Sequence, residues 1–98
     1  MNIQMKEYRK YRSILKVLLK DEADIQGVCL DHLSISDTSK GVALVEAEIK
    51  YLCPTGNHRI LEQAVLNEDG TFLLNSDSPV LNTVLPTWIF VINANRTD

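Results

Sequence analysis

The sequence predicts an α+β protein in which an N-terminal helix packs on a curved antiparallel sheet of four to five strands. Three observations predict this class. Apolar residues recur at every third or fourth position over residues 4–20, apolar and polar residues alternate over residues 42–52, and Asp69-Gly70 separates two apolar runs as a hairpin turn does. The 98 residues are expected to form one domain, residues 1–98.

The first predicted element is a helix over residues 4–20. Its apolar stripe follows spacings of three and four, and is made of Tyr8, Tyr11, Leu15, Leu18 and Leu19. Basic side chains occupy much of the remaining surface. Residues 21–24 include three acids, which oppose the dipole at the C-terminus of a helix, so the helix is expected to end near Lys20.

Successive strands are predicted after the helix, over residues 28–36, 42–52, 58–66 and 71–75. The second of them alternates most clearly, with Glu46, Glu48 and Lys50 on its polar face. Residues 58–66 would also fit a helix capped by Asn57. The Asp-Gly turn that follows favours a strand, because this dipeptide between apolar runs is a strong hairpin signal.

The last predicted strand covers residues 88–92. Its five residues are all apolar, namely Trp88, Ile89, Phe90, Val91 and Ile92. Such a run is consistent with a strand that is covered on both faces or that lies at a subunit contact. A chain of this size is short of core, and an exposed edge strand should carry fewer apolar residues, so these five are predicted to form an interface between two copies.

Charge is distributed unevenly along the chain. The first twenty residues hold six basic residues and one acid, whereas the remainder holds four basic residues and twelve acids. A basic helix beside an acidic body can attract its own domain, a second copy or an acidic partner. Nucleic acid is not expected as a partner, because the sequence pI is about 5.3 and no reader motif is present.

Targeting signals and cysteine content bear on the compartment. No apolar run approaches the roughly 20 residues that cross a bilayer, and the basic N-terminal segment lacks the apolar core of a secretory signal. We therefore expect no membrane association. Two cysteines are too few for a disulfide framework and are interpreted as reduced thiols in a cytoplasmic protein.

The order of these elements, over residues 5–92, resembles that of the cystatin-like and nuclear-transport-factor-like folds. Residues 63–67 (Gln-Ala-Val-Leu-Asn) are similar to the Gln-x-Val-x-Gly loop of cystatins, and residues 86–88 to their Pro-Trp loop. Asn67 stands where cystatins have glycine, and Thr87 separates the proline from the tryptophan, so protease inhibition is not inferred. Folds of this group host enzymes, ligand carriers and interaction modules.

A metal or cofactor is not expected. Two cysteines and two histidines could in principle bind zinc, since Cys29 lies near His32 and Cys53 near His58 in the sequence. Residues three apart on a strand point to opposite faces, so the first pair could not share one metal without a bulge. The sequence also lacks phosphate loops and nucleophile motifs, and catalysis has no positive support.

The leading functional prediction is a small non-enzymatic interaction module that forms a homodimer or binds another protein. One alternative is a ligand-binding or catalytic protein of the nuclear-transport-factor-like group, with a pocket between helix and sheet. Its polar residues would be Tyr8, Tyr11, Asp31, His32 and Tyr51. A third possibility is an immunity or inhibitor protein whose acidic body covers a basic partner.

Overall fold

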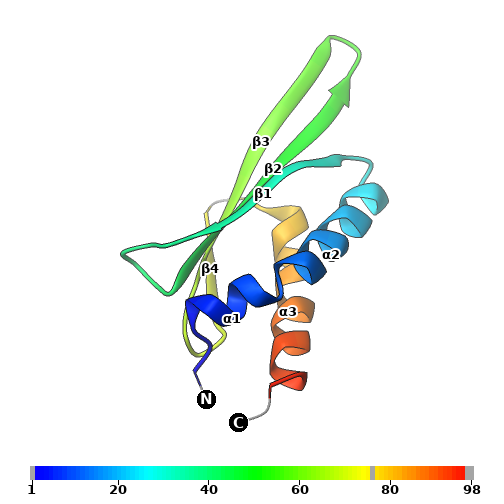
Figure 1. Cartoon of the computed structure of the whole chain (residues 1–98). Helices are drawn as coiled ribbons and strands as arrows, with labels where there is room; N and C mark the ends of the chain where they lie inside the picture. Colours follow the sequence, from blue (N-terminus) through cyan, green and yellow to red (C-terminus); the bar gives the residue numbers. More distant parts are fainter. Residues whose placement is uncertain (1, 76, 97–98) are drawn as a thin grey trace.

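A four-stranded antiparallel sheet carries helices on one of its faces in the computed structural model, which describes residues 2–75 and 77–96 (Figure 1). The strands lie in sequential order, β1-β2-β3-β4. The elements are α1 (Met5–Lys10), α2 (Arg12–Ile25), β1 (Cys29–Ser36), β2 (Ala43–Cys53), β3 (Gly56–Leu66), β4 (Phe72–Leu74) and α3 (Pro79–Ala94). The predicted α+β class is confirmed, as is the N-terminal helix beside an antiparallel sheet.

The N-terminal helical segment differs from the prediction in two ways. It is broken at Tyr11, whose backbone leaves the helical region (φ −100°, ψ 18°), so that α1 and α2 are separate helices. It also continues past Lys20 to Ile25. The predicted end was wrong because the buried stripe of α2 extends through Ala23, and this burial outweighs the unfavourable acids of the last turn.

A glycine ends α2. Gly27 has φ +75°, a conformation that costs a side-chain-bearing residue energy. The Gly27 N–H donates to the carbonyl of Asp24 (3.1 Å), and the Val28 N–H donates to the carbonyl of Ala23 (2.8 Å). This is the Schellman arrangement, and it fixes the direction in which the chain enters β1.

Alternation decides which face of the sheet is covered. In β2, Ala43, Val45, Ala47 and Ile49 are buried, whereas the residues between them are only partly buried. α2 contacts β1, α3 contacts β3, and the two helices pack side by side. Within residues 2–75 and 77–96, no helix lies over the opposite face of the sheet (Figure 1). Residues 56–66 form a strand, so the hairpin signal of Asp69-Gly70 gave the correct interpretation.

The predicted last strand over residues 88–92 is wrong, because these residues belong to α3. Pro79 lies at the start of this helix, where its missing N–H is harmless. Pro86 lies inside the helix and has no N–H to donate to the carbonyl of Asn82. Both residues are exposed, so water can bind that carbonyl instead. The apolar run is therefore helical, with buried residues Val80, Leu81, Val84, Leu85, Trp88, Ile89 and Ile92.

A carboxylate of the sheet caps α3. Glu62 of β3 is fully buried, and its Oε1 accepts a hydrogen bond from the Leu81 N–H (2.8 Å) while Oε2 accepts one from the Val80 N–H (3.4 Å). Ser78, at the N-cap position, makes no such side-chain bond. Burial raises the pKa of Glu62 above its usual value, and the two backbone hydrogen bonds oppose that shift.

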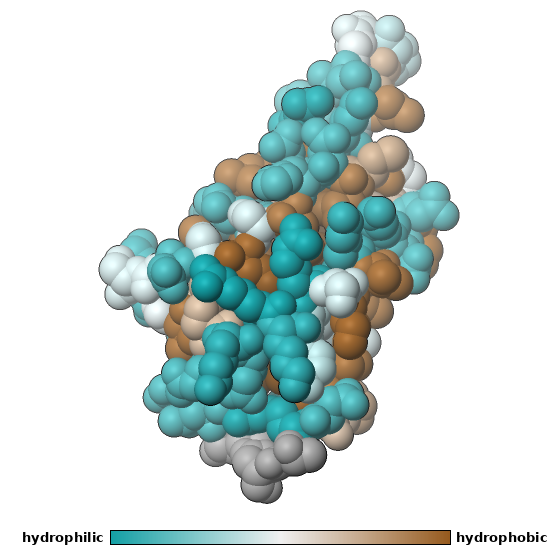
Figure 2. All heavy atoms as spheres, viewed as in Figure 1, coloured by the Kyte–Doolittle hydropathy of each residue, from teal (hydrophilic) through white to brown (hydrophobic). Residues whose placement is uncertain are grey.

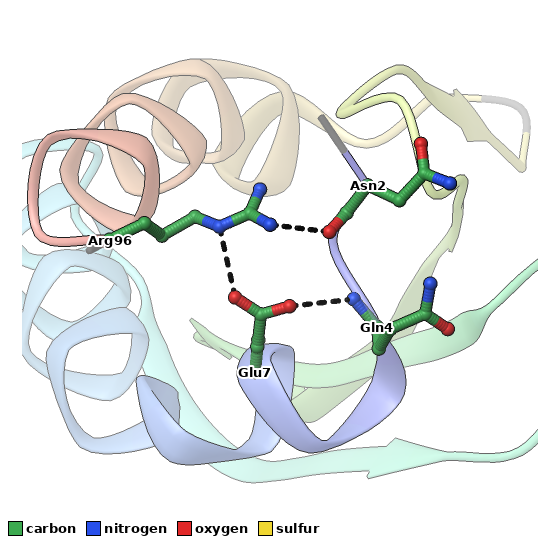
Figure 3. Close-up of polar contacts among 4 residues, drawn as sticks. All are labelled: Asn2, Gln4, Glu7 and Arg96. Atoms are coloured by element: carbon green, nitrogen blue, oxygen red, sulfur yellow. Dashed lines mark hydrogen bonds and ion pairs between the residues drawn. The ribbon is translucent and has the colours of Figure 1, made fainter. Parts of the chain in front are cut away.

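Two further contacts join segments that are distant in sequence. The Trp88 indole N–H donates to the carbonyl of Tyr11 (2.9 Å) at the break between α1 and α2. Near the C-terminus, the Arg96 Nε lies 2.9 Å from the Glu7 carboxylate, and its guanidinium also donates to the carbonyl of Asn2 (Figure 3). The other Glu7 oxygen accepts from the Gln4 N–H. These contacts hold both ends of the described chain against the body.

Candidate functional site

The most distinctive feature of the surface is a two-stranded arm that leaves the body (Figure 1). It is formed by residues 50–61, the far ends of β2 and β3, which stay paired up to Cys53 and Gly56 at the tip. The arm contributes to an elongated shape, with dimensions of 50 × 26 × 17 Å. Every residue from 52 to 61 is exposed.

The arm exposes apolar side chains on both of its faces. Leu52 and Leu61 lie on the face that continues the uncovered side of the sheet, and are 71% and 49% exposed. Ile60, 38% exposed, lies on the other face near Tyr51, whose ring centroid is 6.5 Å from that of His58. Figure 2 shows hydrophilic and hydrophobic surface side by side along this projection. An isolated two-stranded ribbon is marginally stable in water, so this area is a candidate contact surface.

Ion pairs lie at the base of the arm, where they join it to β1 and to the body of β2. The Arg59 guanidinium is 3.4 Å from Asp31 of β1 and 3.4 Å from Glu48 of β2. Asp31 is the extra residue of a bulge, because the pairing between β1 and β2 shifts between Leu30 and His32. All three side chains are at least one third exposed, so these contacts orient Arg59 more than they stabilise the fold.

A small cleft lies between α2 and the edge strand β1. It has a volume of about 190 Å³ and a mainly polar lining made of Arg12, Lys16, Lys20, Leu30, Asp31, His32 and Leu33. The Arg12 guanidinium is half-buried and donates to the carbonyl of Leu33 (2.7 Å), so one cation is fixed in place. Arg12, Lys16 and Lys20 are four residues apart, which places them on one side of α2.

A second, more open hollow lies on the uncovered face of the sheet. Its volume is about 400 Å³, and it is lined by Thr38, Lys40, Leu44, Gln63, Ala64, Val65, Leu73, Leu74 and Asn75. Leu73 is 71% exposed there. The Gln63 amide donates to Glu46 (2.8 Å) and accepts from the Asn75 amide (2.7 Å). The polar groups of the Gln63 side chain thus help to hold the end of β4 against the sheet.

The structure separates the five residues predicted to bind a ligand. Asp31 and His32 share the cleft between α2 and β1, whereas Tyr51 lies at the base of the arm. Tyr8 is fully buried, and its hydroxyl donates to the carbonyl of Asn67 (2.7 Å). Tyr11 is partly buried at the helix break. The region between helices and sheet, where the pocket was predicted, holds a cluster of buried apolar side chains.

The five residues predicted to form an interface differ in their exposure. Trp88, Ile89 and Ile92 are buried within the chain itself, in contact with the core. Phe90 is 72% exposed and Val91 is partly buried, both on α3. The reason for predicting an interface at residues 88–92, an over-apolar edge strand, therefore no longer holds.

The arm was missed in the sequence, although it leaves a signal there. Tyr51 and Leu52 are consecutive, as are Ile60 and Leu61, so both faces of the two strands carry apolar residues toward the turn. A strand pair that is apolar on both faces near its tip needs a second covering surface. The alternation over residues 42–52 was interpreted as one apolar and one polar face, which leaves out the exposed Leu52.

Groups with shifted pKa values take part in hydrogen bonds of the fold. Burial raises the pKa of Tyr8 to about 12, and hydrogen bonds from Thr71 lower the pKa of Asp69 in the turn before β4. Tyr8, Asp69 and Glu62 each form a hydrogen bond with a backbone group of the fold. Over residues 2–75 and 77–96, no three histidine, cysteine or carboxylate side chains are grouped so that they could hold a metal ion.

Comparisons with known proteins add no assignment. Neither the family models, nor the curated proteins, nor the solved structures that were searched include a match to this chain. Among the described residues, no helix has the length and apolar character needed to cross a membrane.

Proposed function

We propose that this protein is a small non-enzymatic interaction module, that the arm formed by residues 50–61 is its contact surface, and that its partner is a second copy of the chain. The observation that carries the proposal is the arm itself. Its strands are fully paired for several residues beyond the body, yet Leu52 and Leu61 stay exposed. Apolar surface of this kind is favourable only when it is covered.

The composition of the arm supports a second copy as the partner. A two-fold contact requires a surface that complements itself. The outward face of the arm carries two leucines and the cations Lys50 and Arg59, and the acid Glu48 lies beside its base, opposite Leu61. Two arms laid antiparallel can cover the leucines of each with those of the other, while opposite charges meet across the axis.

The non-enzymatic role is supported by the groups with shifted pKa values, which are all engaged in structural hydrogen bonds. We further propose that the sheet curves around the helices as in cystatin-like or nuclear-transport-factor-like folds, since sequential antiparallel strands and an N-terminal helix on one face support that arrangement. A cytoplasmic location is proposed because Cys29 and Cys53 are free and exposed, as is usual in a reducing compartment.

The test is the oligomeric state, measured by light scattering over a wide concentration range at low and moderate salt. The wild type is expected to be a dimer, and the double variant L52S/L61S a monomer. The matched control is I25S/F90S, which removes two apolar residues of similar exposure from α2 and α3. A monomeric wild type would exclude the homodimer, and a monomeric control with a dimeric arm variant would place the interface on the helices.

A further inference from the structure

We propose that the cleft between α2 and β1 binds the phosphate group of a small phosphorylated molecule. This site adjoins the arm through the ion pair between Asp31 and Arg59, but its cations lie on α2 and it does not depend on the proposed dimer. Its cations come from one side of α2, where Arg12, Lys16 and Lys20 recur at every fourth residue. The opposite wall is formed by residues 30–33 of β1.

The cations of the cleft are available to an external anion. Among the side chains that the structure describes, no carboxylate lies within ion-pair distance of Arg12, Lys16 or Lys20. The one acid of the lining, Asp31, is paired with Arg59 of the arm at 3.4 Å. The cleft therefore presents three cations and a single carboxylate, which shares Arg59 with Glu48.

One donor is held ready. A guanidinium N–H of Arg12 donates to the carbonyl of Leu33, and this bond fixes the Arg12 side chain against β1. A guanidinium has further N–H groups in the same plane, which suit the oxygens of a phosphate. His32 also lines the cleft, from β1.

Charge and size favour phosphate over other anions. A phosphate monoester carries a charge of about −1.5 to −2 at pH 7, which matches an excess of two cations better than a single carboxylate would. A volume of about 190 Å³ is below that of a typical site for a drug-sized ligand, so a phosphate with a small organic group fits better than a nucleotide. A short cleft of this kind also lacks the aromatic platform on which single-stranded nucleic acid stacks.

Binding can be measured by following backbone amide resonances during titration with inorganic phosphate, and then with glycerol phosphate as a phosphomonoester. Saturable shifts are expected at Lys16, Lys20, His32 and Leu33. The double variant K16Q/K20Q should weaken binding by about tenfold or more, because two charge-assisted contacts are lost. The control K6Q/R9Q removes the same charge from exposed positions on α1 and should bind phosphate within about twofold of the wild type.

Three outcomes would overturn the proposal. The first is a shift that grows linearly with phosphate and never saturates. The second is an equal loss of binding in K16Q/K20Q and K6Q/R9Q, which would indicate diffuse charge attraction. The third is binding of a single-stranded oligonucleotide with none of glycerol phosphate at equal phosphate concentration, which would make the cleft part of a nucleic-acid surface. Tighter binding of glycerol phosphate than of inorganic phosphate would assign the site to an organic phosphate.

Discussion

The same two strands behave differently at their two ends. In the body, residues 43–47 of β2 pair with residues 62–66 of β3 and alternate between buried and partly buried side chains. In the arm, residues 50–53 pair with residues 56–59 in unbroken register, and almost every side chain is exposed. Hydrogen bonding between the strands is continuous, so the difference lies in what covers them.

This contrast separates two contributions to stability. Backbone pairing contributes little net free energy by itself, because the unfolded chain makes the same hydrogen bonds with water. Burial of apolar side chains supplies most of the stabilisation. The body is therefore stable because α2 and α3 cover it, whereas the arm depends on the body for its register and on a partner for its covering. Five predictions test this division.

Trp88→Ala should have the largest effect. The side chain is fully buried, its ring centroid lies 5.5 Å from that of Tyr8, and its N–H binds the break between the two N-terminal helices. We expect a loss of about 3–5 kcal/mol in the free energy of unfolding. Urea denaturation followed by circular dichroism measures it. A loss below about 1 kcal/mol would show that this part of the body is not the stabilising core.

Removal of the Glu62 carboxylate should rank second. Glu62→Ala leaves the N–H groups of Val80 and Leu81 buried without their acceptor, and is expected to cost about 2–4 kcal/mol. Glu62→Gln keeps a carbonyl acceptor and should cost far less. Comparable losses in both variants would mean that the charge, and not the hydrogen bonds, stabilises the start of α3.

The same pair predicts a pH dependence. Burial raises the pKa of Glu62 in the folded protein above its usual 4.5, so the folded state holds this proton more tightly than the unfolded state. Stability from this group is fully present below 4.5 and falls as pH rises through the folded pKa. Unfolding of Glu62→Gln and wild type, compared from about pH 4 to about pH 8, should show the variant gaining relative stability as pH rises. A constant difference would contradict the shift.

Tyr8→Phe should have a moderate effect. It removes the hydrogen bond to Asn67 and keeps the aromatic contact with Trp88, so we expect a loss of about 1 kcal/mol. The wild type should also lose stability from pH 10 to about 12, where the unfolded tyrosine ionises before the folded one. The phenylalanine variant should lack this loss of stability at alkaline pH. Thermal unfolding of both proteins over a series of pH values measures the difference.

The arm should show the smallest effect on the folded monomer. Leu52→Ser and Leu61→Ser are each expected to change the free energy of unfolding by no more than about 0.5 kcal/mol, measured at concentrations below dimerisation. Hydrogen exchange should be fast over residues 50–59 in the monomer and slower in the dimer. Slow exchange there at high dilution would show that the arm is stable without a partner.

The strands were predictable because their signals are local. Alternation over residues 42–52 and the Asp69-Gly70 turn depend only on neighbouring residues, and each observed strand begins and ends within two residues of its predicted range. α3 was missed although its burial follows a helical period. Pro79 and Pro86 divided the run in the sequence, and their compatibility with a helix depends on position and on which side faces solvent.

The candidate sites were less predictable. Basic residues at every fourth position place Arg12, Lys16 and Lys20 together on α2, but only packing against β1 brings Asp31 and His32 to the same cleft. Likewise, alternation assigns each residue of β2 and β3 to a face, yet it carries no information on how far the helices extend along the sheet.

Local patterns of side chains, which reflect backbone geometry, thus fix the class of fold, the strand order and the sign of charge on the first helices. Three features depend on distant parts of the chain: the cap that Glu62 provides for α3, the break at Tyr11 beside Trp88, and the arm that extends beyond the helices. Each is decided by which surfaces meet after folding, because burial is a property of the assembled molecule and not of any one segment.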